Sequence, residues 1–129
     1  MRRLATAIFL ALVVVAGIGT RSVQAQDGLV TFTFTNDAQF TVFVKMFSQD
    51  RAWIWPSATT HYILDDNQPK SARLACNIGE KICFGGSYRE NDTPRWWGVG
   101  YRGNKPCTAC CLTCGAPGDN VEHHWRLIE

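Results

Sequence analysis

The chain has 129 residues, including 13 basic, 11 acidic and 6 cysteine residues, and a formal net charge of +2. This length is typical of one small domain. So small a net charge provides no basic field to attract a phosphate backbone, which excludes nucleic-acid binding as a leading function.

The first 25 residues have the three parts of a secretory signal peptide. Arg2 and Arg3 precede an apolar run at 4–18, and Val23 and Ala25 stand at −3 and −1 of a cleavage point. A membrane anchor is the alternative, but this run has 15 residues, whereas a spanning helix needs about 20. We therefore predict cleavage after Ala25. The product is one exported domain, 26–129, periplasmic or secreted and without a stable membrane anchor. It keeps 10 basic and 11 acidic residues.

Two β-type segments open this domain. Residues 29–35 alternate apolar and threonine side chains with a period of two, as in a strand with one buried face. Asn36 and Asp37 mark a turn, and residues 40–47 form the next run. We expect the two runs to pair antiparallel.

Short strands continue along the rest of the chain. They are predicted at 61–64, 71–76, 81–87, 96–101 and 121–128, separated by turn residues. The turn around Gly79 predicts a hairpin of 71–76 with 81–87. No stretch keeps a helical period, so the predicted fold class is all-β: a small antiparallel β-sandwich or partly open barrel, stapled by disulfides.

An even number of cysteines in a small exported domain predicts a disulfide framework. The last four form the pattern C-x2-C-C-x2-C. Cys76 and Cys83 flank the predicted turn, so they could bond to each other or each reach this cluster. A long-range bridge contributes more stability than a hairpin closure, and the adjacent Cys110 and Cys111 are expected to take different partners. The predicted disulfide residues are Cys76, Cys83, Cys107, Cys110, Cys111 and Cys114.

A metal site is the alternative for the same cluster. Thiolates at C-x2-C spacing suit tetrahedral Zn²⁺, and two histidines follow that could add imidazole ligands. These histidines alternate faces of the last strand, so we expect one to point inward and one outward. The alternative zinc ligands are Cys107, Cys110, Cys111, Cys114, His123 and His124. No other cofactor is predicted.

Trp53 and Trp55 are the candidate ligand-binding residues. They are two residues apart, so in extended chain they share a face, and Pro56 places them at a sheet edge or loop. Such a pair predicts a flat platform for a sugar ring, although most tryptophans in a small domain pack in its core. No arrangement of residues selects a catalytic group, so no catalytic residue is predicted.

Several motifs resemble those of a group of small exported bacterial proteins of uncharacterised function. The likeness is carried by 48–51 (SQDR), 55–56 (WP), 62–66 (YILDD), the C-x6-C of 76–83, 97–100 (WGVG) and the cluster at 107–114. The resemblance implies one exported domain organised around its cysteines. It implies no activity, ligand or catalytic residue.

These observations favour a non-catalytic exported domain that binds an extracytoplasmic ligand: a glycan, an envelope component or another protein. The alternative function is a metal-binding or redox-responsive protein that works through the cysteine cluster.

Overall fold

The computed structural model describes residues 27–92 and 94–128, so the predicted leader lies outside the described part of the chain. That part is almost entirely strand and loop, as the period-two segments predict. In chain order the elements are β1 Gly28–Asn36, β2 Val42–Ser48, β3 Ile54–Trp55, β4 Tyr62–Leu64, β5 Lys70–Cys76, β6 Lys81–Ser87, β7 Trp96–Gly98, β8 Cys111–Thr113, the 3-10 helix η1 Pro117–Asp119 and β9 Glu122–Leu127. None of the described segments is a helix long and apolar enough to cross a membrane.

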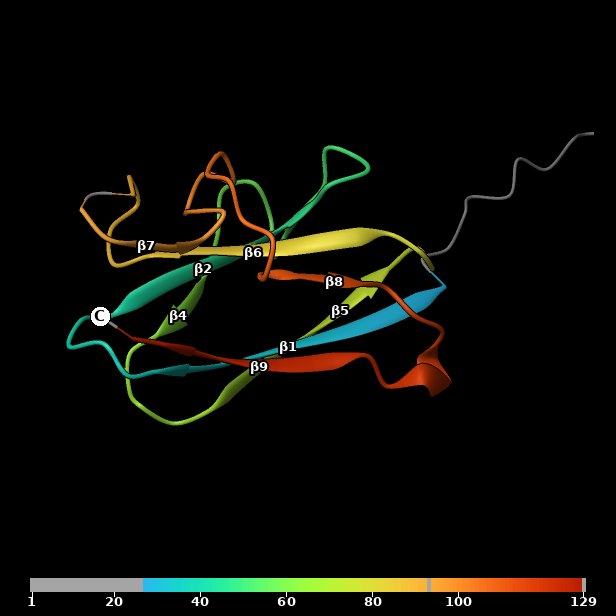
Figure 1. Cartoon of the computed structure of the whole chain (residues 1–129), viewed down its shortest axis with the longest axis horizontal. Coiled ribbons are helices and arrows are strands. Elements are labelled where there is room, and N and C mark those ends of the chain that lie inside the picture. Colours follow the sequence, from blue (N-terminus) through green and yellow to red (C-terminus); the bar gives the residue numbers. More distant parts are fainter. Residues whose placement is uncertain (1–26, 93, 129) are drawn as a thin grey trace, which may run out of the picture.

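Two sheets pack face to face (Figure 1). Sheet A has the order β5-β1-β9, and sheet B has the order β3-β2-β6-β7, with β4 pairing β2 and β8 pairing β6. The predicted all-β fold with two sheets is confirmed. The pairs are antiparallel except β1 with β9, which is parallel, so the expectation of a wholly antiparallel sandwich is wrong for that pair.

The predicted pairing of 29–35 with 40–47 is also wrong, because β1 lies in sheet A and β2 in sheet B. The turn between them does begin at Asn36, whose side-chain amide donates to the carbonyls of Phe40 at 2.7 Å and Leu64 at 3.0 Å. The chain crosses from one sheet to the other there. The apolar faces of the two strands therefore meet across the core instead of lying side by side.

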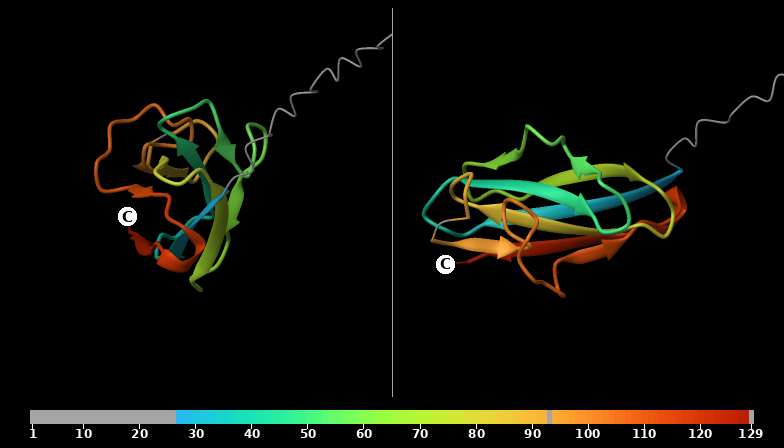
Figure 2. Two further views of the ribbon diagram at one scale, coloured as in Figure 1. Left: turned by 90° about the vertical axis from the view of Figure 1, so that its right-hand side faces the viewer. Right: turned by 90° about the horizontal axis from the view of Figure 1, so that it is seen from above.

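The same error affects the predicted hairpin of 71–76 with 81–87. β5 pairs with β1, and β6 pairs with β2, so the turn between β5 and β6 is a second crossing between the sheets. Figure 2 allows both crossings to be followed from the side and from above. Turn residues identify where a strand ends, but they do not say which strand will be its neighbour.

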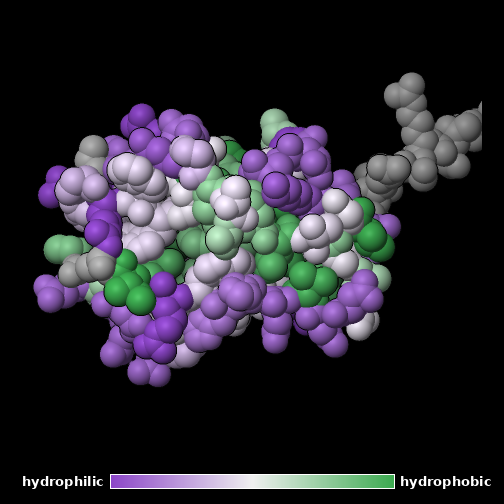
Figure 3. Space-filling view, viewed as in Figure 1, coloured by the Kyte–Doolittle hydropathy of each residue, from purple (hydrophilic) through white to green (hydrophobic). Residues whose placement is uncertain are grey.

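Apolar side chains from both sheets form the core. Phe32 of β1 stacks on Trp125 of β9, with ring centroids 5.2 Å apart, and Phe34 meets Phe84 of sheet B edge-on at 4.9 Å. In the view of Figure 3 an apolar band crosses the middle of the molecule, at the height where the sheets meet, with hydrophilic residues above and below. The most deeply buried aliphatic side chains are Val30, Val42, Val44, Met46, Leu74, Ile82 and Leu127.

All six cysteines are paired in disulfides. Cys76 bonds to Cys114, Cys83 bonds to Cys111, and Cys107 bonds to Cys110. Each cysteine of the C-x6-C pair thus reaches the cluster, and the two adjacent cysteines take different partners. The first two bridges close loops of 38 and 28 residues, each of which is expected to contribute about 3.5–4 kcal/mol in the chain-entropy model.

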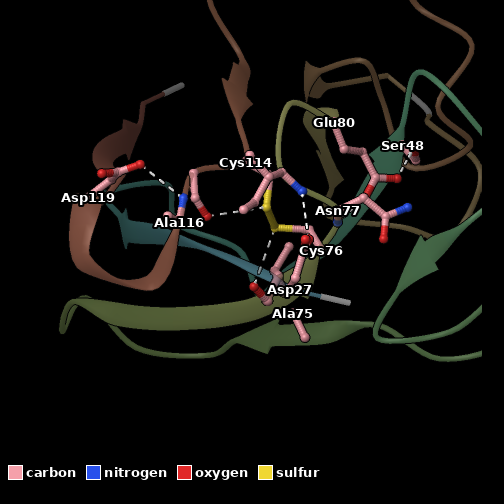
Figure 4. Close-up of a disulfide and its surroundings, with 12 residues drawn as sticks. Asp27, Ser48, Ala75, Cys76, Asn77, Glu80, Cys114, Ala116 and Asp119 are labelled. Atoms are coloured by element: carbon pink, nitrogen blue, oxygen red, sulfur yellow. Dashed lines mark hydrogen bonds between the residues drawn. A yellow bond between two sulfur atoms is a disulfide. The ribbon is translucent and has the colours of Figure 1, made fainter. Parts of the chain in front are cut away.

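A buried carboxylate holds the turn between β5 and β6. The side chain of Glu80 is 2% exposed and accepts hydrogen bonds from Arg51 Nε at 2.5 Å, Ser48 Oγ at 2.6 Å and the Asn77 amide at 3.0 Å. Its own carbonyl accepts from the Cys114 amide at 2.8 Å, and Figure 4 shows Glu80, Ser48 and Asn77 beside the Cys76–Cys114 bridge. One side chain therefore ties the start of the β2–β3 loop to the turn.

The bonds to Glu80 also decide its protonation. Burial raises the pKa of this carboxyl, but the hydrogen bonds from Arg51, Ser48 and Asn77 outweigh burial and leave the pKa below its usual range. A lowered folded-state pKa stabilises the fold above the unfolded-state pKa of about 4.3. That stability is lost as the pH falls through the lower folded-state value.

We expect Glu80→Gln to lower the free energy of unfolding at pH 7 by about 1–3 kcal/mol, because three donors lose a charged acceptor. The difference from wild type should shrink as the pH falls below about 4.3. Urea titrations with the disulfides intact measure both effects. Asp66→Asn is the matched control, since Asp66 is exposed and its ion pair with Lys70 is long, at 3.8 Å. Equal losses in the two variants would contradict the role given to Glu80.

Candidate functional site

Two chain segments cover the outer face of sheet B, and we call them the loop layer: residues 57–61 and 99–110. The core face of β2 carries Val42, Val44 and Met46, so its alternate residues face outward toward this layer. A Cβ on Gly85 of β6 would overlap the backbone oxygen of Gly100. Backbone therefore lies directly on the sheet at this point, as only glycine permits.

The loop layer buries a polar cluster against the sheet. Lys45 is 7% exposed, donates from Nζ to the Ala58 carbonyl at 3.0 Å, and lies 4.5 Å from the centroid of the Tyr101 ring. The Tyr101 hydroxyl is 3.0 Å from His61 Nδ1, and the Tyr101 amide donates to the Asp92 carboxylate. Burial, with a smaller effect of Glu90, raises the pKa of the Tyr101 hydroxyl, so the phenol stays protonated. The cluster joins both segments of the layer to the sheet.

Beside this layer, β7 and the end of β9 form a shallow open hollow of about 420 Å³. Its floor is fixed by the Ile128 carbonyl, which accepts from Trp97 Nε1 at 3.0 Å and from Arg95 Nη2 at 3.1 Å. Trp96 borders this hollow and is 44% exposed. The hollow is lined by Pro94, Arg95, Trp96, Trp97 and Ile128.

A lysine holds the ring of Trp96 in place. Lys105 Nζ lies 4.5 Å from the centroid of that ring, at cation–π distance. The lysine stem packs against the backbone of Gly100, and the Lys105 amide donates to the Val99 carbonyl at 2.9 Å. Because Lys105 is not among the residues that line the hollow, it covers one face of the indole while the hollow opens beside the ring.

The described residues around the hollow carry positive charge. Among them, no carboxylate lies within ion-pair distance of Arg95 or Lys105. The described part of the chain thus brings together a half-exposed indole, a second indole and two cations. We call this group the Trp96 site.

The two residues predicted as a ligand platform differ in their exposure. Trp55 is 7% exposed and donates from Nε1 to the Ala75 carbonyl at 3.2 Å, so it belongs to the core. Trp53 is 47% exposed, with the Arg51 guanidinium 4.8 Å from its ring centroid. The same guanidinium lies 5.8 Å from the Trp55 ring centroid, so both rings lie beside one cation, but only Trp53 is open to solvent.

The alternative zinc ligands are also placed differently from what the spacing predicts. Cys107, Cys110, Cys111 and Cys114 are all in disulfides, and a disulfide sulfur is not a thiolate ligand. The two histidines lie on opposite faces of β9, with His123 on the face of Trp125 and Leu127 and His124 on the other, and both are exposed. His123 packs edge-on against Trp125 at 4.5 Å, and His124 Nε2 is 2.6 Å from Thr35 Oγ1. Zinc binding would require these bridges to be reduced first.

Another concavity, of about 350 Å³, opens at the flank of the sandwich between β4 and β5. Its one cation, Lys70, is already paired with Asp65 at 2.6 Å. The remaining lining is mostly apolar, and no unpaired charge there selects a ligand. It is formed by Phe34, Tyr62, Ile63, Leu64, Lys70, Ser71 and Ala72.

No protein-family model, curated protein or solved structure matches this chain. The candidate site therefore depends on the geometry of its own residues. One sequence signal could have identified it: Trp96 and Trp97 are adjacent in a strand, so they must point to opposite sides, and only one of them can enter the core.

We expect Gly85→Ala to lower the free energy of unfolding by about 2–3 kcal/mol, because the added methyl forces the loop layer off the sheet. Urea titration measures this loss. Gly118→Ala is the matched control, since a Cβ there would meet nothing within 4 Å. If Gly85→Ala is as stable as the control, the layer does not depend on this contact.

Proposed function

We propose that this protein is an exported, non-catalytic domain that binds an acidic glycan through the Trp96 site. The sequence pattern of residues 1–25 and the three disulfides support an oxidising compartment outside the cytoplasm. The observation that carries the binding role is the Trp96 ring, 44% exposed and fixed by a lysine 4.5 Å away.

A fixed indole is well suited to a sugar ring. The C–H groups on one face of a pyranose pack against a flat aromatic surface, and a large rigid side chain loses little conformational entropy on binding. Lys105 strengthens this arrangement because it holds the indole in one position before the ligand arrives. Six large apolar side chains of the described residues are exposed, and Trp96 is the one whose aromatic ring borders a hollow with a second indole.

The charge of the site favours an acidic ligand. Arg95 and Lys105 flank the hollow without carboxylate partners among the described residues. A uronic-acid carboxylate would receive charge-assisted hydrogen bonds from either cation. A neutral sugar would stack on Trp96 equally well but would leave both charges unmatched.

The lining of the hollow supports binding without hydrolysis. Glycoside cleavage normally requires two carboxyl groups on either side of the bond that breaks. The described residues that line the hollow supply an arginine, two indoles, a proline and an isoleucine, with no carboxylate among them.

Titration calorimetry with a uronic-acid oligosaccharide tests this proposal. We expect Trp96→Ala to lower the affinity by at least about tenfold, the loss typical of a truncated aromatic anchor. Trp53→Ala is the matched control, because Trp53 is equally exposed and also has a cation over its ring, yet lies outside the hollow. The same oligosaccharide with its carboxylates reduced to alcohols should bind more weakly, and added salt should reduce only the acidic ligand's advantage.

Two results would contradict the proposal. One is the absence of binding to the acidic oligosaccharide at millimolar concentration. The other is an affinity that Trp96→Ala and Trp53→Ala lower equally, which would place the ligand elsewhere.

A further inference from the structure

A group of three sulfur atoms lies beneath the loop layer, apart from the Trp96 site. The Sγ atoms of Cys83, Cys110 and Cys111 all lie within 4.8 Å of one another. They belong to two different disulfides, because Cys83 bonds to Cys111 and Cys110 bonds to Cys107. The Sγ atoms of Cys110 and Cys111 are 3.7 Å apart.

The backbone keeps these sulfurs together independently of the bridges. β6 and β8 pair with Cys83 opposite Cys111, and the Phe84 amide donates to the Cys110 carbonyl at 2.9 Å. Cys110 and the first residue of β8, Cys111, thus both lie along the edge of β6 beside Cys83. Either Cys110 or Cys111 can present its sulfur to Cys83 with little movement of the chain.

The cysteines differ in their access to solvent. Cys110 and Cys83 are each 2% exposed, whereas Cys107 and Cys111 are only partly buried, so each bridge has one accessible and one buried end. A thiol from outside therefore reaches the Cys107–Cys110 bridge at Cys107. The sulfur that leaves is then Cys110, which is already buried beside the second bridge.

We infer that the cluster is a thiol–disulfide exchange site in which an external thiol opens the Cys107–Cys110 bridge and Cys110 passes the exchange to the Cys83–Cys111 bridge. In the first step the external thiolate attacks Cys107 Sγ. A mixed disulfide forms at Cys107, the Cys107–Cys110 bond breaks, and the electron pair leaves on Cys110 Sγ.

In the second step the Cys110 thiolate attacks Cys83 Sγ. A Cys83–Cys110 bond forms, the Cys83–Cys111 bond breaks, and Cys111 leaves as a thiolate that takes a proton from water. Attack on Cys111 would instead join adjacent residues and strain the peptide between them, so Cys83 is the favoured target. A second external thiol then releases Cys107, leaving thiols at Cys107 and Cys111 and the external thiol oxidised to its disulfide.

Peptide mapping of the mature, fully oxidised protein tests this sequence. The protein is treated with graded reduced glutathione, acid-quenched and alkylated. We expect the singly reduced protein to carry alkyl groups at Cys107 and Cys111 and a new Cys83–Cys110 bridge. Cys76–Cys114 serves as an internal control: both its residues are at most 2% exposed, and neither belongs to the three-sulfur group. It should stay oxidised.

A double variant, Cys107→Ser with Cys110→Ser, separates the relay from direct attack. It keeps both long-range bridges, so the fold should be retained. Reduction of Cys83–Cys111 should slow on the order of tenfold or more, because the positioned thiolate is gone.

The inference is overturned if singly reduced wild-type molecules carry alkyl groups at Cys107 and Cys110 with Cys83–Cys111 intact. It is equally overturned if the double variant loses Cys83–Cys111 at the wild-type rate. Neither outcome bears on glycan binding.

Discussion

The close contact of the loop layer with sheet B at Gly85 is the constraint on which the rest of the candidate surface depends. A side chain at this position would occupy the place of the Gly100 backbone. With the backbone seated there, the Lys105 stem packs on Gly100 and its ammonium reaches the Trp96 ring. Further along the same segment, Cys107 and Cys110 close their bridge beside Cys83. One missing side chain thus sets the positions of both the aromatic site and the sulfur group.

The motifs of the resemblance have structural roles where the structure describes them. Ser48 and Arg51 donate to the buried Glu80 carboxylate, and Asp50 accepts from the Lys81 amide at 2.9 Å. The two long-range disulfides anchor the cysteine cluster to β5 and β6. These residues therefore belong to the scaffold and not to the Trp96 site.

Much of the fold could be predicted from local sequence, because period-two alternation and turn residues are local properties. The alternation in 29–35 correctly predicts β1, and the glycine turn correctly separates β5 from β6. Which strands become neighbours depends on the burial of apolar faces across the core, and that is a property of the whole chain. For this reason two turns that resemble hairpin turns instead cross between sheets.

The candidate site was less predictable for a related reason. Trp53 and Trp55 have the spacing of a platform and both lie beside the Arg51 guanidinium, but Trp55 is buried and only Trp53 is exposed. The Trp96 site combines β7, the end of β9 and a loop residue, Lys105. No local sequence pattern predicts that these three segments lie together. The disulfide framework was easier to predict from the sequence. The even cysteine count and the expected export favour disulfides, and the strain of a bridge between neighbouring residues excludes Cys110–Cys111.

The aromatic site and the sulfur group share one covalent segment, and this has a physical consequence. Lys105 lies two residues before Cys107, and its backbone amide donates a hydrogen bond to the Val99 carbonyl at 2.9 Å, which holds the segment at one end. Opening the Cys107–Cys110 bridge removes the constraint at the other end. The loop closed by that bridge is short, so the entropy gained is modest, but it is gained next to the residue that fixes the Trp96 ring. An indole that is free to change rotamer must be ordered again when a ligand binds, and this lowers affinity. Thiol exchange at Cys107 would therefore weaken ligand binding by loosening the platform, without altering any residue that lines the hollow.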